Sequence, residues 1–360
     1  MLSFHPLKVA AVERVAEDAA CVTVEIPPAL RDAFAFHAGQ YVTVRRMIEG
    51  REERRTYSIV TAPGGGVLKL GIRLQLGGRM SGELASQLHA GDLLDVGTPM
   101  GRFRTAVSAE REHSYVAFAA GSGITPILSL ATDILAREPR SRVTLIYGNR
   151  SISRTMFLEE TLALKNRYIE RFAVHFVMSR EPQQTAWLNG RIDARKVHEI
   201  ARHMSEVSAA DEYLICGPGD MVDEVRSAIK TLNGNAAIRF ERFAAAAPRP
   251  IERGVRHSAI APVAQEVLAN ISVVMDGRRR SFPMAPGDAS VLEAAERAGL
   301  ELPFSCRSGI CATCRARITA GAAVMTHNIA LEPWETAAGF VLCCQARPTT
   351  AALEISFDHK

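Results

Sequence analysis

The sequence has almost no excess of charge of either sign. Its 43 Lys and Arg residues stand against 39 Asp and Glu residues, which gives a formal net charge of +4. So small an excess argues against a nucleic-acid partner, because proteins that bind nucleic acid gather basic residues on one face. With 47% hydrophobic and 23% charged residues, the composition is that of a folded globular protein rather than a disordered chain.

The sequence also lacks signals for export and for membrane insertion. Residues 1–8 have neither the basic start nor the apolar core of a signal peptide. The most hydrophobic stretch, residues 115–136, is interrupted by Gly121, Gly123 and Pro126, which argues against a continuous helix facing lipid. We therefore expect a cytoplasmic protein with no membrane partner.

Cysteine is scarce, and its distribution is uneven. Five of the seven cysteines lie between Cys306 and Cys344, which is unlike a disulfide framework and indicates a metal site in a reducing compartment. Cys306, Cys311 and Cys314, followed after 29 residues by Cys344, have the spacing with which thiolates hold a plant-type 2Fe–2S cluster. Four thiolates also bind zinc, but zinc sites usually pair two short Cys-x-x-Cys knuckles, and the second half here has only adjacent cysteines. Because neighbouring residues on a strand point to opposite faces, only one of Cys343 and Cys344 should be a ligand.

Hydrophobic patterns divide the 360 residues into three segments. In the first hundred residues, short β-rich runs alternate with turn residues, which predicts a small antiparallel β-barrel. From about 114 to 243 the pattern changes to strand, glycine turn and helix, which is typical of an α/β domain with a doubly wound parallel sheet. An alanine- and proline-rich stretch then precedes a third domain. The expected boundaries are 1–108 for the barrel, 109–244 for the α/β domain, 245–264 for the linker and 265–360 for the last domain.

Two short motifs in the barrel segment have the chemistry to hold a flavin nucleotide. In residues 55–58 (RTYS), a guanidinium can bind a pyrophosphate, an aromatic face can lie on an isoalloxazine ring, and a hydroxyl can reach flavin N5. Residues 77–81 (GGRMS) precede a helix-like stretch at 82–89, whose N-terminus can meet a phosphate. Arg73 and Arg79 are either further phosphate ligands or ordinary surface arginines.

Two glycine-rich turns in the α/β segment are suited to a nicotinamide dinucleotide. Residues 119–126 (AAGSGITP) end a predicted strand and open a helix, and residues 216–219 (CGPG) follow another strand. Glycines at such turns let the backbone approach a pyrophosphate, although a single G-x-G is weak evidence. After the second strand, Arg150 and Arg154 could bind a 2′-phosphate, and no acidic residue stands beside them to hold a free 2′-hydroxyl. This favours NADPH over NADH.

These motifs resemble those of the ferredoxin–NADP reductase superfamily, and residues from about 268 onward resemble a plant-type ferredoxin domain of the α+β β-grasp fold. In such domains the last ligand stands in a Leu-[Ser/Thr]-Cys-Gln context, which reads LCCQ at 342–345 here. The resemblance implies that Cys344 is the ligand and that Cys343 replaces a hydroxyl residue. Residues 99–103 (PMGRF) are similar to the FAD-binding members rather than to those that bind FMN. The implied cofactors are FAD, NADPH and one 2Fe–2S cluster.

The resemblance assigns catalytic roles to Ser58 and Cys216, with Cys216 near C4 of the nicotinamide. The implied metal ligands are Cys306, Cys311, Cys314 and Cys344. The implied cofactor-binding residues are Arg55, Thr56, Tyr57, Ser58, Ile72, Arg73, Gly78, Arg79, Met80, Ser81, Gly121, Ser122, Gly123, Thr125, Pro126, Asn149, Arg150, Arg154, Cys216, Gly217, Pro218 and Gly219.

Segments along nearly the whole chain are similar to the reductase subunits of bacterial ring-1,2-phenylacetyl-CoA epoxidases, among them 4–9 (FHPLKV), 241–243 (ERF) and 309–314 (GICATC). This similarity implies an NADPH-dependent oxidoreductase that passes electrons through FAD and the cluster to a di-iron oxygenase in aerobic phenylacetate catabolism. The oxygenase subunits of the epoxidase complex would be its partners. One alternative is a reductase of the same architecture for another acceptor, such as a steroid or ring hydroxylase or the hybrid-cluster protein. A second is a ferredoxin-like binding module without enzymatic activity.

Arg307, Arg315 and Arg317 flank the cluster loop. We expect them either to face an acidic patch of the oxygenase, with encounter steered by charge, or merely to solvate the loop.

Overall fold

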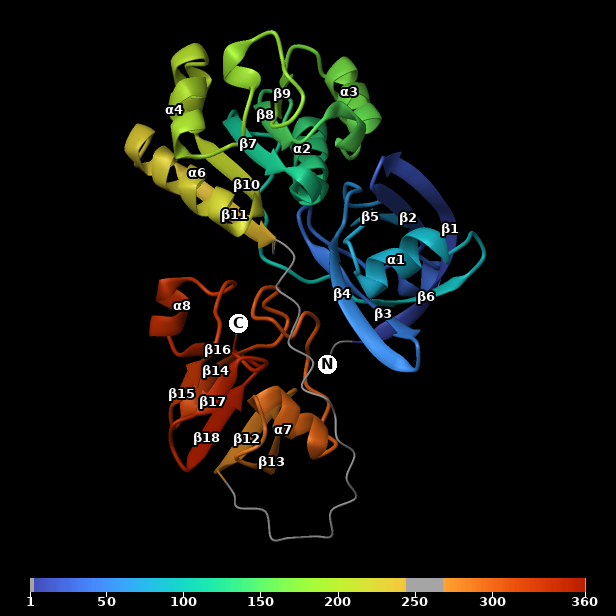
Figure 1. Ribbon diagram of the computed structural model, residues 1–360, viewed down its shortest axis with the longest axis vertical. Helices are drawn as coiled ribbons and strands as arrows, with labels where there is room; N and C mark the ends of the chain where they lie inside the picture. The colour runs from blue at the N-terminus through green and yellow to red at the C-terminus, as the bar shows by residue number, and fades with distance from the viewer. Residues whose placement is uncertain (1–2, 244–267, 360) are drawn as a thin grey trace. The chain divides into compact units, whose positions relative to one another are not determined.

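The computed structural model describes residues 3–243 and 268–359. The chain divides into two compact units, an N-terminal unit within Phe4–Ala245 and a C-terminal unit within Ala246–Lys360 (Figure 1). The linker expected at 245–264 lies outside the described residues.

The N-terminal unit begins with an antiparallel β-barrel, drawn in blue and cyan in Figure 1. Apolar side chains that alternate along its strands, among them Leu7, Val22 and Val42, point inward and form one buried core. The strand order is β4-β3-β6-β1-β2-β5, and an isolated bridge between Ile59 and Leu70 joins the two edges. The expected barrel is confirmed. Its elements are β1 (Phe4–Ala16), β2 (Ala19–Glu25), β3 (Tyr41–Ile48), β4 (Arg51–Ser58), β5 (Val67–Arg73), α1 (Arg79–Ser86) and β6 (Leu93–Gly97).

The second part of this unit is a five-stranded parallel sheet with helices on both faces, as the sequence predicted. Alternate side chains of the same strand enter different cores, so Ala117 packs on the side of α2, whereas Val116 packs on the side of α4 and α6. The elements are β7 (Ser114–Ala120), α2 (Ile124–Arg137), β8 (Arg142–Asn149), α3 (Leu158–Arg167), β9 (Phe172–Met178), α4 (Ala194–His203), α5 (Glu206–Ala209), β10 (Glu212–Pro218), α6 (Gly219–Leu232) and β11 (Ala237–Phe243). The hydrophobic stretch 115–136 is thus a strand and a helix, and no helix in the described residues has the length and apolarity to cross a membrane.

The strand order of this sheet is β11-β10-β7-β8-β9. Successive strands are added on one side of β7 as far as β9 and then on its other side, so that β7 has β8 on one side and β10 on the other. Open α/β sheets bind ligands outside the carboxyl ends of the strands at such a reversal. The turns that follow β7 and β10 are therefore the place to look for the coenzyme.

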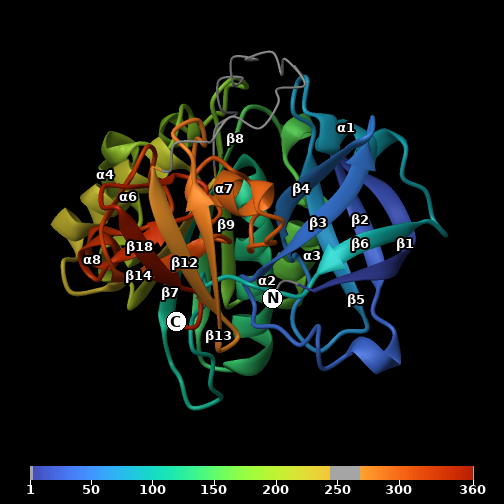
Figure 2. The ribbon, with the colours of Figure 1, turned by 90° about the horizontal axis from the view of Figure 1, so that it is seen from below.

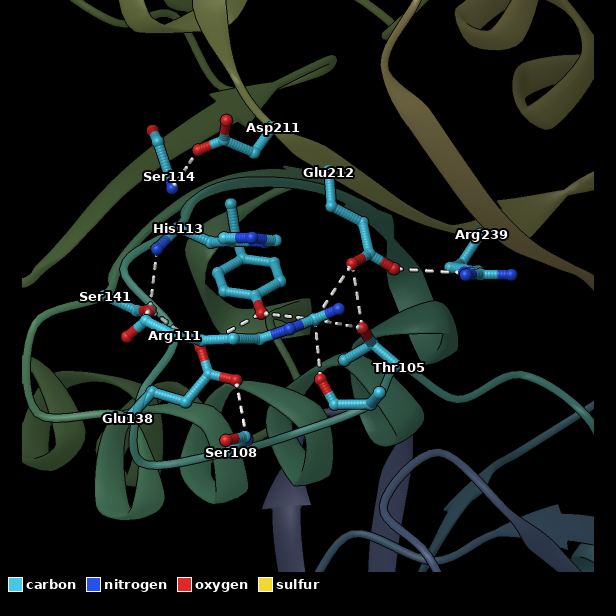
Figure 3. Close-up of polar contacts among 12 residues, drawn as sticks. Thr105, Ser108, Arg111, His113, Ser114, Glu138, Ser141, Asp211, Glu212 and Arg239 are labelled. Atoms are coloured by element: carbon cyan, nitrogen blue, oxygen red, sulfur yellow. Dashed lines mark hydrogen bonds and ion pairs between the residues drawn. The ribbon is translucent and has the colours of Figure 1, made fainter.

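The segment between the barrel and the sheet is held at the opposite edge, by the amino ends of the strands (Figure 3). Thr105 donates a hydrogen bond to Glu212 Oε2 at 2.8 Å, and the backbone N–H of Ser108 donates to Glu138 Oε1 at 3.2 Å. Glu138 is fully buried and Glu212 is 3% exposed. Arg111 donates to the carbonyl of Ala106 at 2.6 Å, within the connecting segment itself. These bonds fix the connection between the two parts of the unit.

The C-terminal unit is a mixed sheet with one helix packed on it, in the α+β arrangement expected. The strand order is β13-β12-β18-β14-β16, in which only β12 and β18 are parallel, and Figures 1 and 2 both show α7 lying beside the β12–β13 hairpin. The elements are β12 (Ala269–Met275), β13 (Arg278–Met284), α7 (Val291–Arg297), β14 (Arg315–Ala320), β15 (Ala323–Met325), α8 (Pro333–Ala337), β16 (Phe340–Leu342), β17 (Ala346–Pro348) and β18 (Ala352–Ser356).

Candidate functional site: a coenzyme crevice and a cysteine loop

The two glycine turns of the α/β domain meet at the reversal of the strand order. A Cβ atom on Gly123 would lie 2.1 Å from the carbonyl oxygen of Cys216, so only glycine allows the start of α2 to approach the end of β10 this closely. Gly121 has a φ of +56°, a conformation that glycine adopts without strain. The residues predicted at 119–126 and 216–219 are therefore brought together, and Thr125 and Pro126 are buried in the first turn of α2.

Cys216 lies beside a carboxyl group that the sequence motifs did not indicate. In the parallel pairing of β10 and β11, Cys216 is the partner of Glu241, and Ser58 of the barrel donates to Glu241 Oε2 at 3.4 Å. Three segments thus converge on one point. The only sequence signal for Glu241 was its place in the ERF segment at 241–243.

Burial sets the protonation of this group of side chains. Desolvation raises the pKa of the Cys216 thiol well above its ordinary value of 9.0, so the thiol stays neutral. Desolvation also raises the pKa of Glu241 to about 8, against an opposing contribution from the hydrogen bond of Ser58. At neutral pH, Glu241 is therefore mostly protonated. The site can hold a proton without placing a negative charge beside it.

The flavin motif at 55–58 lies at the end of strand β4. Arg55 is exposed and donates to the carbonyl of Arg54 at 2.7 Å, with an ion pair to Glu53 at 3.1 Å. Tyr57 is half-buried, Ser58 is buried, and desolvation raises the pKa of the Tyr57 phenol. An exposed guanidinium, an aromatic face and a hydroxyl along one strand fit a flavin and its pyrophosphate.

The second flavin motif forms the beginning of a helix. The sequence predicted that residues 77–81 precede a helix at 82–89, but α1 begins at Arg79, so that expectation was wrong by three residues. The cause is Gly78 at the N-cap: a Cβ there would lie 2.7 Å from Ser81 Oγ, which itself accepts a hydrogen bond from the Gln75 N–H at 3.1 Å. Met80 is buried. A helix N-terminus of this kind can bind an anion.

Arg79 and Arg73 are both engaged with carboxylates. Arg79 donates to the carbonyl of Ile48 at 2.8 Å and pairs with Glu49 at 3.0 Å. Arg73, which follows Ile72 at the end of β5, pairs with Asp18. The Arg73 pair is largely shielded from solvent, whereas the Arg79 pair lies at the surface, because Glu49 is 82% exposed.

The segment after β8 differs in charge from what the sequence predicted. Asn149 is 8% exposed, and neither its Nδ2 nor its Oδ1 has a hydrogen-bond partner among the described residues, which fits a site that a ligand completes. Arg150 is exposed, but Arg154 is bound to Asp18. The expectation that no acidic residue stands here was wrong, since Glu181 accepts a hydrogen bond from the Ile152 N–H at 2.8 Å. Asp18 and Glu181, which are distant in sequence, therefore place negative charge beside this segment.

The four expected ligand cysteines approach one another in two pairs. Cys306 contacts Cys311, and Cys314 contacts Cys344. Two pairs of thiols suit two irons with two thiolates each. The backbone N–H of Ser308 donates to Cys306 Sγ at 3.4 Å, and hydrogen bonds of this kind tune a cluster.

Cys343 lies apart from this group. Its side chain is fully buried in the hydrophobic core of the unit, and desolvation raises its thiol pKa. Its backbone N–H donates to the carbonyl of Cys314, and its own carbonyl accepts from the N–H of Leu292 in α7. Cys344 is 8% exposed, beside Gln345, whose amide donates to Cys344 Sγ at 3.8 Å.

The arginines around the cysteine loop have partners within their own unit. Arg307 forms a two-pronged ion pair with Glu296, and Arg315 pairs with buried Glu335 at 2.9 Å. Arg317 is exposed and donates to a backbone carbonyl. Glu296 and Glu335 therefore balance the charge of Arg307 and Arg315 within this unit, and docking of an acidic patch of the oxygenase on the loop stays a prediction.

Three family models match the chain. The oxidoreductase FAD-binding domain matches residues 6–105, the oxidoreductase NAD-binding domain matches residues 118–227, and the 2Fe-2S iron-sulfur cluster binding domain matches residues 273–349. FAD, a nicotinamide dinucleotide and a 2Fe–2S cluster are therefore the cofactors of this chain.

Two relatives extend over nearly the full length. The chain is 37% identical over 361 residues to a 1,2-phenylacetyl-CoA epoxidase subunit of Escherichia coli (strain K12), and the match covers 100% of this chain and 99% of the relative. It is 29% identical to the ferredoxin reductase component of 3-ketosteroid-9-alpha-monooxygenase of Rhodococcus rhodochrous, with 98% and 96% covered.

Among solved structures, phthalate dioxygenase reductase has a TM-score of 0.57 at 22% identity, with 99% of this chain and 98% of that chain covered, which shows a common fold. The chain is an NAD(P)H oxidoreductase and belongs to the same family as this 1,2-phenylacetyl-CoA epoxidase subunit.

Proposed function

We propose that this chain is the reductase of a phenylacetyl-CoA epoxidase, which takes electrons from NADPH and delivers them to a di-iron oxygenase component in phenylacetate catabolism. The observation that carries this proposal is the 37% identity to the epoxidase subunit of Escherichia coli over the whole length of both chains. FAD supplies the capacity to accept a hydride and release electrons singly, and the cluster supplies a one-electron relay. The reducing environment of the cytoplasm would suit the seven cysteines, which form no disulfide.

The chain's own residues would position the nicotinamide and hold a proton. Ser58 Oγ lies on the flavin side of the crevice and is oriented by Glu241, which is protonated at neutral pH. Cys216, neutral and buried at the end of β10, presents a compact surface against which a nicotinamide ring can lie. None of the three side chains places a negative charge where a hydride must pass.

We assign the contacts to the phosphates and to the cluster from the places of the motifs in the fold. We assign the flavin phosphates to Arg55 and to the N-terminus of α1, and the coenzyme pyrophosphate to the turn at Gly121. We assign the cluster to Cys306, Cys311, Cys314 and Cys344, in the two pairs described above.

We also propose NADPH as the preferred coenzyme, with Arg150 as the ligand of the 2′-phosphate. Arg150 is exposed at the carboxyl end of β8 and pairs with no carboxylate in the described part of the chain. Arg154, the other candidate, would first have to leave Asp18. One guanidinium available in this way supports a moderate preference for NADPH.

The proposal is tested by reconstitution. In aerobic buffer, the purified chain and the oxygenase subunits should together consume NADPH, phenylacetyl-CoA and O2 in equal amounts. Oxygenases of the ketosteroid and ring-hydroxylase type, and the hybrid-cluster protein, serve as competing acceptors. Faster transfer to any of them than to the epoxidase would overturn the assigned acceptor, while the reductase activity would stand.

The cluster assignment has its own test. The reduced protein should show the electron paramagnetic resonance signal of a 2Fe–2S cluster, and Cys344→Ser should abolish or alter it. Cys343→Ser is the matched control, one residue away and in the core, and should leave the signal nearly intact. The reverse pattern would show that the fourth ligand is Cys343.

A further inference from the structure

A single carboxylate joins the barrel to the α/β domain beside the coenzyme crevice. Asp18, in the turn between β1 and β2, accepts from the guanidinium of Arg73 through Oδ1 and from that of Arg154 through Oδ2. Arg73 also donates to the backbone carbonyl of Arg154 at 3.1 Å. The side chains of Asp18 and Arg73 are only 16% and 15% exposed. The three residues form a closed group that spans both parts of the unit.

The guanidinium of Arg73 lies next to the glycine turn. Its Nη2 is 3.8 Å from the position that a Cβ of Gly121 would take. Two residues earlier on the same strand, a Cβ on Gly71 would lie 2.5 Å from Cγ2 of Thr125, so β5 is in direct contact with the start of α2. A cation from the barrel thus stands where the backbone turn admits the pyrophosphate of a nicotinamide dinucleotide.

Asp18 fixes the position of the Arg73 guanidinium. Arg73 has two of its donors used, Nη1 on Asp18 and Nη2 on the Arg154 carbonyl, which fixes the plane of the guanidinium while Nη2 keeps a second N–H. A mostly buried guanidinium that loses its carboxylate is left with an uncompensated charge, so it would turn toward solvent. The two arginines and the one carboxylate together carry one net positive charge, which suits an anionic ligand.

We propose that Asp18 is a positioning residue for the coenzyme: it holds Arg73 beside the turn at Gly121 to receive the pyrophosphate, and it binds Arg154 so that the barrel and the α/β domain close on the same ligand. The neighbouring Glu17 has a different task. It binds Ser153 through its side chain at 2.9 Å and reaches neither arginine. The inference rests on the use of NAD(P)H by this family and is independent of the proposed acceptor.

The test measures binding of ADP-ribose, which carries the pyrophosphate without the nicotinamide, to the oxidised holoenzyme by calorimetry. Asp18→Asn should weaken binding about tenfold, since a charge-assisted contact is lost. The conservative variant Asp18→Glu should restore most of the affinity. Arg73→Ala should weaken binding as much as Asp18→Asn, and the double variant should be no weaker than Arg73→Ala alone, because Asp18 acts through Arg73. Glu17→Gln is the matched control and should bind as the wild type does.

The kinetic counterpart is NADPH oxidation with ferricyanide, which needs no oxygenase. Asp18→Asn should raise KM for NADPH and leave kcat nearly unchanged, whereas a general structural defect would lower kcat and the flavin content together. Unchanged ADP-ribose affinity in Asp18→Asn, tighter binding, or additive losses in the double variant would each overturn the proposal. If Asp18→Asn does not retain FAD, Asp18→Glu and Arg73→Lys decide the matter by the same measurements. A wild type without NADPH oxidation would refute the reductase function instead.

Discussion

The two edges of the parallel sheet differ in how fully their carboxyl groups are hydrogen-bonded. Glu138 and Glu212 at the amino edge are buried, and Glu241 at the carboxyl edge is half-buried. At the amino edge, both oxygens of Glu138 accept hydrogen bonds, and both oxygens of Glu212 are likewise occupied (Figure 3). At the carboxyl edge, Glu241 accepts a single long hydrogen bond, from Ser58. The donors at the amino edge are Ser108, Tyr115 and Ser141 for Glu138, and Thr105 and Arg239 for Glu212.

This difference separates a structural carboxyl group from a functional one. Where every lone pair is used, the group holds segments together and has no capacity left for a ligand. Where partners are missing, as for Glu241 and for the buried amide of Asn149, the polar atoms are available to a molecule that enters. If burial alone identified the coenzyme site, it would point to the amino edge, since Glu138 is more deeply buried than Glu241. Hydrogen-bond satisfaction, not burial, distinguishes the coenzyme edge.

The largest effect is expected from removing the satisfied carboxylate. Glu138→Ala leaves three donors without their acceptor, so it should lower the free energy of unfolding by about 3–5 kcal/mol, measured by urea denaturation of the holoenzyme. Glu112→Ala, which removes a carboxylate that is 74% exposed in the same region, should change it by less than about 0.5 kcal/mol. A similar loss in both variants would show that the network does not stabilise the fold.

At the carboxyl edge, we expect substitutions to lower the rate of flavin reduction rather than the free energy of unfolding. Glu241→Gln removes the proton-holding group beside Ser58, and we expect the rate of flavin reduction by NADPH to fall about 100-fold in stopped-flow absorbance. At about pH 4.5, where Glu241 is protonated in the folded wild type, the free energy of unfolding should change by less than about 1 kcal/mol. Ser58→Ala should cause a loss of similar size, and the double variant should be little worse, because the two groups act as one unit. A stability loss as large as that of Glu138→Ala would contradict the distinction between the edges.

Sequence patterns were sufficient for the parts of the site that are local in sequence. The turns at 119–126 and 216–219 and the cysteine loop each stand within a few residues, and their glycines and thiols carry the signal themselves. Glu241 was missed because its neighbours come from the register of β10 with β11 and from a barrel residue 183 positions away.

The charges were misread for the same reason. The ion pairs of Arg154 with Asp18 and of Arg315 with Glu335 join segments that are distant in sequence. The carboxylate that pairs with an arginine must be near it in the folded structure, but it need not be near it in the sequence. The start of α1 was misplaced for a more local reason, since a glycine N-cap is a weaker signal than Ser, Thr, Asp or Asn.

Glu241 should also make stability depend on pH. The folded-state pKa of Glu241, about 8, lies above its ordinary value of 4.5, so the folded protein binds the proton more tightly than the unfolded chain. The contribution of this group is fully present below about pH 4.5 and is lost as the pH rises through about 8. The wild type should therefore lose stability relative to Glu241→Gln between about pH 5 and 9 in thermal unfolding. Parallel curves for the two proteins would mean that the carboxyl group is not buried in solution.

The smallest effect compares two exposed arginines at opposite ends of β8. Arg142 opens the strand at the amino edge, and Arg150 follows it at the carboxyl edge. If Arg150 receives the 2′-phosphate, Arg150→Ala should reduce the ratio of kcat/KM for NADPH to that for NADH about tenfold, since one charge-assisted contact is lost. Arg142→Ala changes the same charge on the same strand and should leave the ratio unaltered. The measurement is initial-rate kinetics with ferricyanide at two salt concentrations, because a long-range charge effect would fade with salt and would appear in both variants, whereas a direct contact persists in one. An unchanged ratio in Arg150→Ala would remove the basis for NADPH preference and direct attention to Glu181, whose carboxylate at the same edge could accept a free 2′-hydroxyl.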